Sequence, residues 1–200
     1  MTALLIIDIQ NDFLPGGALA VPGGNEIIPI VNNMMGSFDL VVATKDWHPP
    51  DHGSFAANHP GHDLFETVDL NGLPQTLWPV HCVQETEGAE FPVALHTDRI
   101  GKFFHKGTRL EIDSYSGFHD NGHRHSTGLT DFLRENGVTE ITVCGLATDY
   151  CVKFTALDAI AEGFATTLHL PACRGVNLQP DDIENAIAEM RDKGVEIVEK

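Results

Sequence analysis

Short runs of apolar, mostly β-branched residues recur along this chain, and they show no strict alternation of apolar and polar positions. Strands buried on both faces of a sheet have this pattern, because neither face meets water. Segments with helical spacing separate the runs, and three of them end at a glycine, as a helix with a left-handed cap does. The predicted strands span residues 3–8, 39–46, 140–145, 165–170 and 195–199, and the predicted helices span residues 25–35, 127–137, 148–163 and 180–194.

This alternation of strands and helices predicts an α/β fold with a doubly wound, mostly parallel sheet. Ligands of such folds bind at the carboxyl ends of the strands, so we expect the chemistry at that edge. The chain has 200 residues, 42% of them hydrophobic, which suits one core. No repeat, linker or low-complexity tract divides it, and we expect a single domain over residues 1–200.

The middle of the chain, roughly residues 47–125, has a different character. It is rich in Pro, Gly, Asn and His, its periodicity is weak, and it holds ten of the eleven histidines. A long irregular segment inside a compact domain is usually functional or disordered, and the aromatic residues in WHPPDHGSF and LWPVHC argue against simple disorder.

The charge of the chain argues against nucleic acid and membranes as partners, and its apolar runs and cysteines indicate where the protein is located. Twelve lysines and arginines against 29 acidic residues give a formal net charge of −17, which would repel nucleic acid and anionic membranes. No apolar run approaches the ~20 residues of a membrane span, and MTALLIIDIQ has neither a basic region nor a cleavage site, so we expect a cytoplasmic protein. The four cysteines form no CxxC pair and are predicted to be free thiols.

Cys151 lies where the strand EITVCG should give way to a helix. With Thr148 or Asp149 as the N-cap, Cys151 would lie in the first helical turn, where free backbone N–H groups stabilise a thiolate and lower the thiol pKa. That environment would make a nucleophile. The alternative is a small buried thiol that packs on the sheet.

A nucleophilic cysteine needs a proton acceptor, and Asp8 ends an apolar strand at the edge where Cys151 is expected. A carboxylate at the end of an apolar strand is either a functional acid or a cap or turn residue. Asp12 is a second candidate for the proton acceptor, but a local capping residue is the better interpretation of Asp12. Lys106 would hold Asp8 and Cys151 in their ionised forms if it lies beside them; otherwise it is a solvated residue at a strand end. Lys102 has no comparable setting.

Asp46 and His48 form a D-x-H pair that places both side chains on one side of an extended chain, which suits two ligands of a divalent metal. His81 could supply a third ligand atom, and His52 a fourth, or an outer partner. One carboxylate with imidazoles suits Zn²⁺, Fe²⁺ or Mn²⁺. The alternative for the D-x-H pair is a hydrogen-bonded surface pair. The histidines assigned to surface loops are His59, His62, His119, His123 and His125.

Three aromatic residues, Phe13, Trp78 and Tyr115, lie next to these stretches. Converging on one sheet edge they would form a flat apolar slot for a planar ring; otherwise they belong to the core or a lid.

Six motifs in order along nearly the whole chain resemble the nicotinamidase/pyrazinamidase branch of the isochorismatase-like hydrolases. They are DIQNDF (8–13), KDWHP (45–49), WPVHC (78–82), FHKG (104–107), DSYSGF (113–118) and GLATDYCV (145–152). The resemblance implies a three-layer fold, with a six-stranded parallel sheet between helices.

The resemblance also implies roles for the catalytic candidates. Cys151 stands at the family's nucleophile, Asp8 at its general base and acid, and Lys106 at the lysine that completes the triad. Leu146 and Ala147 stand where the family has a cis peptide bond, and the backbone N–H groups of Ala147 and Cys151 match its oxyanion hole. Leu146 is also expected to contact the substrate.

For the metal and the substrate pocket, the resemblance makes ligands of Asp46, His48 and His81. His52 stands where some members add a histidine and others leave water. We expect zinc, with iron or manganese as alternatives. The walls of the nicotinamide pocket match Phe13, Trp78 and Tyr115.

The implied activity is hydrolysis of nicotinamide to nicotinic acid and ammonia through a cysteine thioester, with pyrazinamide accepted as well. An oligomer is compatible with the sequence. Two alternatives stay open: a related cysteine amidohydrolase that acts on another small amide, and a non-catalytic metal or redox protein in which Cys151 is a sensor thiol.

Overall fold

The structure is a computed structural model that describes residues 1–200. Its central sheet has six strands, and every neighbouring pair is parallel. The strands are β1 (Thr2–Ile7), β2 (Leu40–Asp46), β5 (Lys102–Lys106), β6 (Glu140–Leu146), β7 (Ala165–Arg174) and β8 (Glu196–Val198). They lie in the order β5-β2-β1-β6-β7-β8, which confirms the predicted doubly wound, parallel architecture.

Each of the five predicted strands is present, and the sixth, β5, lies in the segment expected to be irregular. β5 is an edge strand in which only Phe104 and Lys106 are buried, while Phe103 is 51% exposed. Its sequence therefore lacks the continuous apolar run that marks a strand covered on both faces. The same middle segment forms an antiparallel hairpin of β3 (Thr67–Leu70) and β4 (Leu73–Thr76).

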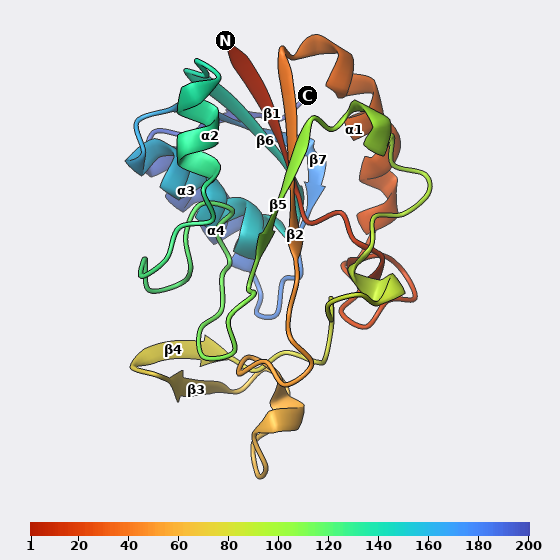
Figure 1. Ribbon diagram of the computed structural model, residues 1–200, viewed down its shortest axis with the longest axis vertical. Helices are drawn as coiled ribbons and strands as arrows, with labels where there is room; N and C mark the ends of the chain where they lie inside the picture. The colour runs from red at the N-terminus through yellow and green to blue at the C-terminus, as the bar shows by residue number, and fades with distance from the viewer.

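Four α-helices cover the sheet: α1 (Ile28–Met34), α2 (Leu129–Glu135), α3 (Lys153–Ala161) and α4 (Asp182–Asp192). Figure 1 shows α1 on one side of the sheet and α2, α3 and α4 on the other, which makes the expected three layers. The chain moves outward from β1 through β2 to β5, then returns and moves outward from β6 to β8. Right-handed crossovers in opposite directions place their helices on opposite faces. None of these helices is long and apolar enough to cross a membrane.

Shorter turns complete the chain. The 3-10 helices are Asn11–Phe13, Gly24–Ile27, Met35–Ser37, Ala56–Asn58, Glu87–Ala89 and Thr97–Arg99, and Thr148–Val152 forms a π-helical turn.

The helix predicted to begin at Thr148 or Asp149 begins differently. The π-helical turn occupies Thr148–Val152, α3 begins at Lys153, and no side chain caps either element. The Asp149 carboxylate instead accepts hydrogen bonds from the backbone N–H groups of Val176 and Asn177, at 2.9 and 2.7 Å. The predicted N-cap is wrong for both candidates, because Thr148 and Asp149 lie inside the π-helical turn and Ala147 is its N-cap. The loop after β7 also occupies both oxygens of Asp149.

The two central strands, β1 and β6, approach closely at their carboxyl ends. Gly145 has φ +122°, and a Cβ atom there would lie 2.2 Å from the carbonyl oxygen of Ile7. No larger residue fits this contact. From this point the connections run in opposite directions, so the crevice beyond the two strands is the binding position of a doubly wound sheet. The β3–β4 hairpin lies beyond the same ends of the strands (Figure 1).

Candidate active site

Asp8 directly follows β1 and lies at the crevice. Its backbone adopts a left-handed conformation with φ 47°, which is uncommon for a residue other than glycine and often marks a functional position. The side chain is fully buried, and its Oδ1 accepts a hydrogen bond of 2.6 Å from the hydroxyl of Thr44 on β2.

Lys106, the last residue of β5, reaches across the carboxyl end of β2 to Asp8. Its Nζ lies 2.8 Å from Oδ2 of Asp8 and donates to Oδ1 of Asp46. The same ammonium donates to the carbonyl of Ser114 at 2.9 Å and to Sγ of Cys151 at 3.3 Å. Lys106 is only 2% exposed, so the interpretation of a solvated lysine is excluded. A buried ammonium needs such partners, because an unpaired one would be costly to desolvate.

Burial decides the protonation of the Cys151 thiol. It raises the pKa of Cys151 well above that of a free thiol, although Lys106 acts in the opposite direction. Burial also raises the pKa of Asp8, to about 6, again against the effect of Lys106. The resting site therefore pairs a neutral thiol with an ionised carboxylate at neutral pH, and not the thiolate expected from a helix N-terminus. A proton acceptor lies ready for the thiol.

Asp46, His48 and His81 come together as one group, and their ligand atoms lie within 4.8 Å of one another. Oδ2 of Asp46 lies 3.7 Å from Nε2 of His48 and 3.9 Å from Nε2 of His81. The Nδ1 atoms of the two histidines are bonded elsewhere, to the carbonyls of Gly107 at 2.8 Å and Pro79 at 2.7 Å. These carbonyls select the tautomer whose Nε2 faces the group, as metal-binding histidines require.

The electrostatics of this group suit a cation. Burial, together with the charge of His48, lowers the pKa of His81 to about 4, so its imidazole is neutral. Burial acts to raise the pKa of Asp46, but Lys106 and His48 outweigh it and hold the pKa well below its usual range. Burial would lower the pKa of His48, but the charge and hydrogen bond of Asp46 outweigh it and raise the pKa. The donor set fits a divalent metal of the Zn²⁺, Fe²⁺ or Mn²⁺ kind.

His52 is not part of this group. Its Nδ1 lies 2.7 Å from the hydroxyl of Ser54, and its Nε2 lies 3.4 Å from the carbonyl of Ile112. The ring packs against that of His48, with 4.3 Å between centroids. The structure therefore places His52 behind His48, in a second group of potential ligands with His48 and Asp113, and not with Asp46 and His81.

A largely apolar pocket with about 370 Å³ of open space leads to these residues. Phe13, Trp78 and Tyr115 all line it, as the slot hypothesis predicts. Nε1 of Trp78 donates to the Tyr115 hydroxyl at 3.2 Å, which holds the two rings at 88° to each other. Side chains that the sequence analysis did not single out also line the pocket: Leu19, Asp113, Tyr150 and Val176. Tyr150 lies in the motif GLATDYCV beside Cys151, and Asp113 begins the motif DSYSGF, so these two motifs were the available signals.

Leu146 and Ala147 differ in their relation to the pocket. The peptide bond between them is cis, as the resemblance implies. Ala147 lines the pocket beside Cys151, but Leu146 is fully buried and does not line it. Leu146 ends β6 and belongs to the main core, so the structure does not place it at the pocket wall where a contact with the substrate was expected.

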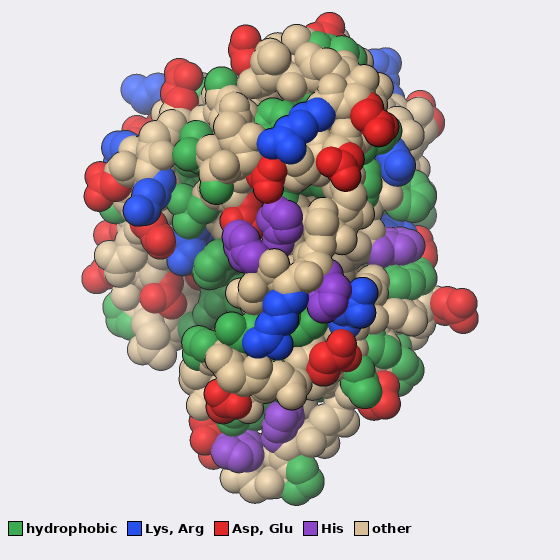
Figure 2. All heavy atoms as spheres, turned by 60° about the vertical axis from the view of Figure 1, so that its left-hand side comes forward, with side chains coloured by type: hydrophobic (Ala, Val, Ile, Leu, Met, Phe, Trp, Pro, Cys, Tyr) green, Lys and Arg blue, Asp and Glu red, His purple; other side chains and the backbone are tan.

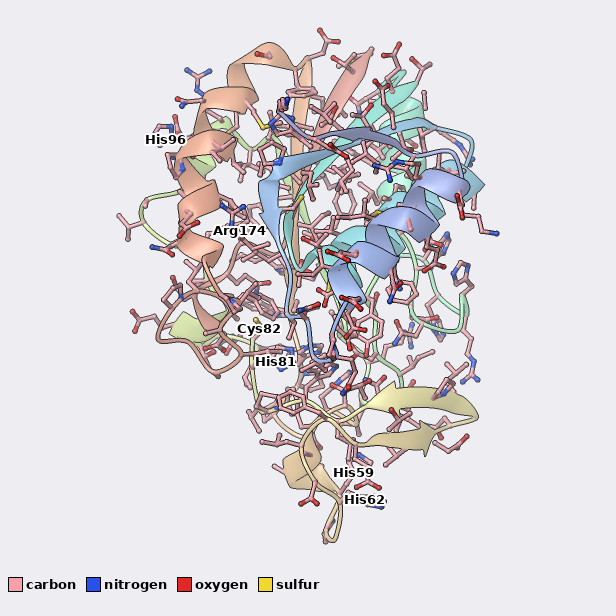
Figure 3. The ribbon with its side chains drawn as sticks, turned by 180° about the vertical axis from the view of Figure 1, so that it is seen from behind. His59, His62, His81, Cys82, His96 and Arg174 are labelled. Carbon is pink, nitrogen blue, oxygen red and sulfur yellow. The ribbon has the colours of Figure 1, made fainter.

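Most of the remaining histidines lie away from the site. His59 and His62 occupy the tip of the loop before β3, far from His81 (Figure 3). On the face shown in Figure 2, histidine side chains lie among acidic and basic ones. Four of the predicted surface histidines lie beside carboxylates: His62 beside Glu66, His119 beside Glu162, His123 beside Asp158, and His125 beside Asp120.

Comparison with known proteins agrees with this geometry. The isochorismatase domain matches residues 2–200. The nicotinamidase of Escherichia coli strain K12 is 48% identical, with 96% of this chain and 92% of that protein covered. A solved Acinetobacter baumanii nicotinamidase/pyrazinamidase has a TM-score of 0.96 at 46% identity, covering 98% and 95% of the two chains. A Pyrococcus horikoshii pyrazinamidase, solved in complex with zinc, has a TM-score of 0.80 at 40% identity, covering 100% and 99%.

The three-layer fold and these relatives define an amidohydrolase. More particularly, the chain belongs to the isochorismatase family, on its nicotinamidase/pyrazinamidase branch.

Proposed function

We propose that this protein hydrolyses nicotinamide to nicotinic acid and ammonia, and pyrazinamide in the same way, with Cys151 as the nucleophile. The observation that carries the proposal is the meeting of Cys151, Lys106 and Asp8 at a pocket walled by aromatic rings. A flat apolar slot suits a planar ring, and a thiol beside a carboxylate suits attack on a carboxamide. In this proposal, residues 1–200 form a single domain that carries the site.

The metal is proposed to be held by Asp46, His48 and His81, with zinc as the first candidate because of the zinc-bound relative. When bound, it would supply a Lewis acid to which the ring nitrogen of the substrate can coordinate. Phe13 and Trp78 hold the plane of the ring, and this orients the carboxamide toward Cys151. His52 supports His48 from behind and is not a ligand in this proposal.

The first half of the reaction begins with transfer of the thiol proton of Cys151 to Asp8, while Sγ attacks the carboxamide carbon. Lys106 stabilises the sulfur as its charge develops, since its ammonium lies 3.3 Å from Sγ. The backbone N–H groups of Ala147 and Cys151 receive the oxyanion of the tetrahedral intermediate. Asp8 then gives the proton to the nitrogen, the carbon–nitrogen bond breaks, ammonia leaves and a thioester remains.

In the second half, Asp8 takes a proton from a water molecule, whose oxygen attacks the thioester carbon. The carbon–sulfur bond breaks, Asp8 returns the proton to Sγ, and nicotinic acid is released. The raised pKa of Asp8, about 6, suits a group that must both accept and return a proton near neutral pH.

The test is ammonia release from nicotinamide by the zinc-loaded protein, compared with benzamide, which has the same shape without the ring nitrogen. We expect rapid release from nicotinamide and pyrazinamide and little from benzamide. Release from aliphatic amides but not from nicotinamide would favour another small-amide hydrolase. No release from any amide by folded, metal-loaded protein would favour a sensor thiol.

A further inference from the structure

Gln10 is a fully buried amide in the loop that follows Asp8. Its side chain forms three hydrogen bonds, and two of them go to the backbone of Asp46. Oε1 accepts from the Asp46 N–H at 2.8 Å, while Nε2 donates to the Asp46 carbonyl at 2.7 Å and to the Ala89 carbonyl at 2.8 Å. All three hydrogen bonds of this amide thus go to backbone groups, and Gln10 does not line the pocket.

The Gln10 side chain can pair with the Asp46 backbone because β1 ends before it reaches the level of Asp46. β1 pairs with β2 but ends at Ile7, and the left-handed backbone of Asp8 turns the chain away, so no β1 backbone lies opposite Asp46. Buried N–H and C=O groups must nevertheless be paired. The Gln10 amide replaces the missing strand residue on one side of Asp46, while β5 pairs with Asp46 through Lys106 on the other side.

Asp12, two residues further on, makes an equivalent contact with the second metal-ligand loop. Its Oδ2 accepts a hydrogen bond of 2.7 Å from the backbone N–H of Cys82. Cys82 has φ 46°, and its carbonyl accepts from the His48 N–H at 3.0 Å. Asp12 therefore holds the strained peptide that directly follows His81. Figure 3 shows His81 and Cys82 together near the ends of the strands, between the sheet and the β3–β4 hairpin.

We propose that Gln10 and Asp12 are positioning residues of the metal site, with Gln10 orienting Asp46 and Asp12 orienting His81 through Cys82. The inference rests on the metal assignment in the proposed function. Because both residues belong to the segment that begins with Asp8, one short stretch of chain sets the distance between the proton acceptor and two metal ligands.

The hydrogen bonds of Gln10 and Asp12 differ from that of Asn11, because they hold the backbone of the proposed metal ligands or of a residue next to one. Asn11, between the two residues, also donates from its side-chain amide to a carbonyl, that of Glu87 at 2.8 Å, but this bond lies at the surface and touches no ligand loop. Loss of groups that orient metal ligands typically weakens metal affinity about 10–100-fold. Loss of a surface anchor should leave the affinity unchanged.

The experiment compares Gln10→Leu and Asp12→Ala with the matched control Asn11→Ala. Zn²⁺ affinity is measured by competition with a chromophoric chelator, the visible spectrum of the Co²⁺-loaded protein reports ligand geometry, and thermal unfolding is followed without metal. We expect Zn²⁺ affinity to fall about 10–100-fold in Gln10→Leu and Asp12→Ala, with an altered Co²⁺ spectrum, and to stay native in Asn11→Ala.

Gln10→Leu leaves buried backbone groups of Asp46 unpaired and can lower the melting temperature, so affinity is compared only below the melting transition. If Gln10→Leu does not fold, Gln10→Glu, which keeps the acceptor for the Asp46 N–H, takes its place. Native Zn²⁺ affinity and a native Co²⁺ spectrum in the folded Gln10 and Asp12 variants would overturn the proposal. These readouts need no turnover, so a wild-type protein inactive on nicotinamide would reject the proposed function without changing this comparison.

Discussion

Lys106 donates from Nζ to Sγ of Cys151 across 3.3 Å, although 45 positions separate the two residues in the sequence. The ammonium comes from an edge strand and the thiol from the turn after a central strand, and both are buried. The same ammonium lies against Asp8 and Asp46, so it joins the proposed nucleophile, its proton acceptor and a proposed metal ligand.

Replacement of Lys106 by Met should destabilise the fold as well as abolish turnover. The variant would leave two buried carboxylates, Asp8 and Asp46, without their cation, and breaking a buried ion pair in this way costs about 3–5 kcal/mol. Urea unfolding of the metal-free protein measures the change. Lys102→Met, at the exposed end of the same strand, is the matched control and should change stability little. Equal stability of the two variants would contradict the buried network.

Loss of His48 should remove the metal. Its Nε2 is one of three ligand atoms in the group, so His48→Ala should lose most bound zinc and bind nicotinamide weakly, while the Cys151 thiol remains intact. Elemental analysis after dialysis measures the metal. His62→Ala, on an exposed loop tip, should keep it. Full metal content in His48→Ala would reject the ligand assignment.

Gly107→Ala should weaken metal binding although it replaces none of the ligands. A Cβ atom at Gly107 would lie 2.3 Å from Cε1 of His48, whose Nδ1 bonds to the Gly107 carbonyl. Gly61→Ala is the control for backbone strain, since Gly61 also has positive φ but its added Cβ meets nothing within 4 Å. Chelator competition should give weaker Zn²⁺ binding for Gly107→Ala alone. Similar affinities for both variants would contradict the contact.

Trp78→Ala should raise KM for nicotinamide by roughly tenfold or more, because a wall of the ring slot is lost. The effect on kcat should be smaller, since Trp78 does not contact the reacting sulfur in the proposed mechanism. Steady-state kinetics of ammonia release separate the two constants. Phe103→Ala, on the exposed face of the edge strand, should leave KM unchanged. An unchanged KM in Trp78→Ala would assign the ring to ordinary packing.

The strands that the sequence predicts well are those covered on both faces. β1, with Ala3–Ile7 fully buried, is an example, because its apolar run has no other explanation. β5 and the β3–β4 hairpin lie at an edge and at the surface, where burial is partial and leaves no such run. Tertiary pairing with β2, which no local pattern encodes, makes Lys102–Lys106 a strand.

The candidate site also has features that local sequence patterns predict and features that depend on the assembled fold. Asp8 and Cys151 could be predicted because they lie at the ends of apolar strands, and parallel strands end at one edge. Asp46 could be predicted from its D-x-H spacing to His48. The state of the Cys151 thiol could not, since it depends on burial that only the assembled fold sets. The contacts of Gln10 and Asp12 also escape sequence reasoning, because their partners, Asp46 and Cys82, lie 36 and 70 positions away.

Ammonia release by zinc-loaded Cys151→Ala tests the proposed covalent mechanism most directly. The variant removes only Sγ from the pocket, so it should fold, keep its metal and still bind nicotinamide, as zinc analysis and ligand titration can verify. Without sulfur no thioester can form, and ammonia release should fall to the rate of the buffer control. Turnover well above that rate in the folded, zinc-loaded variant would contradict the covalent mechanism and make a water molecule the nucleophile.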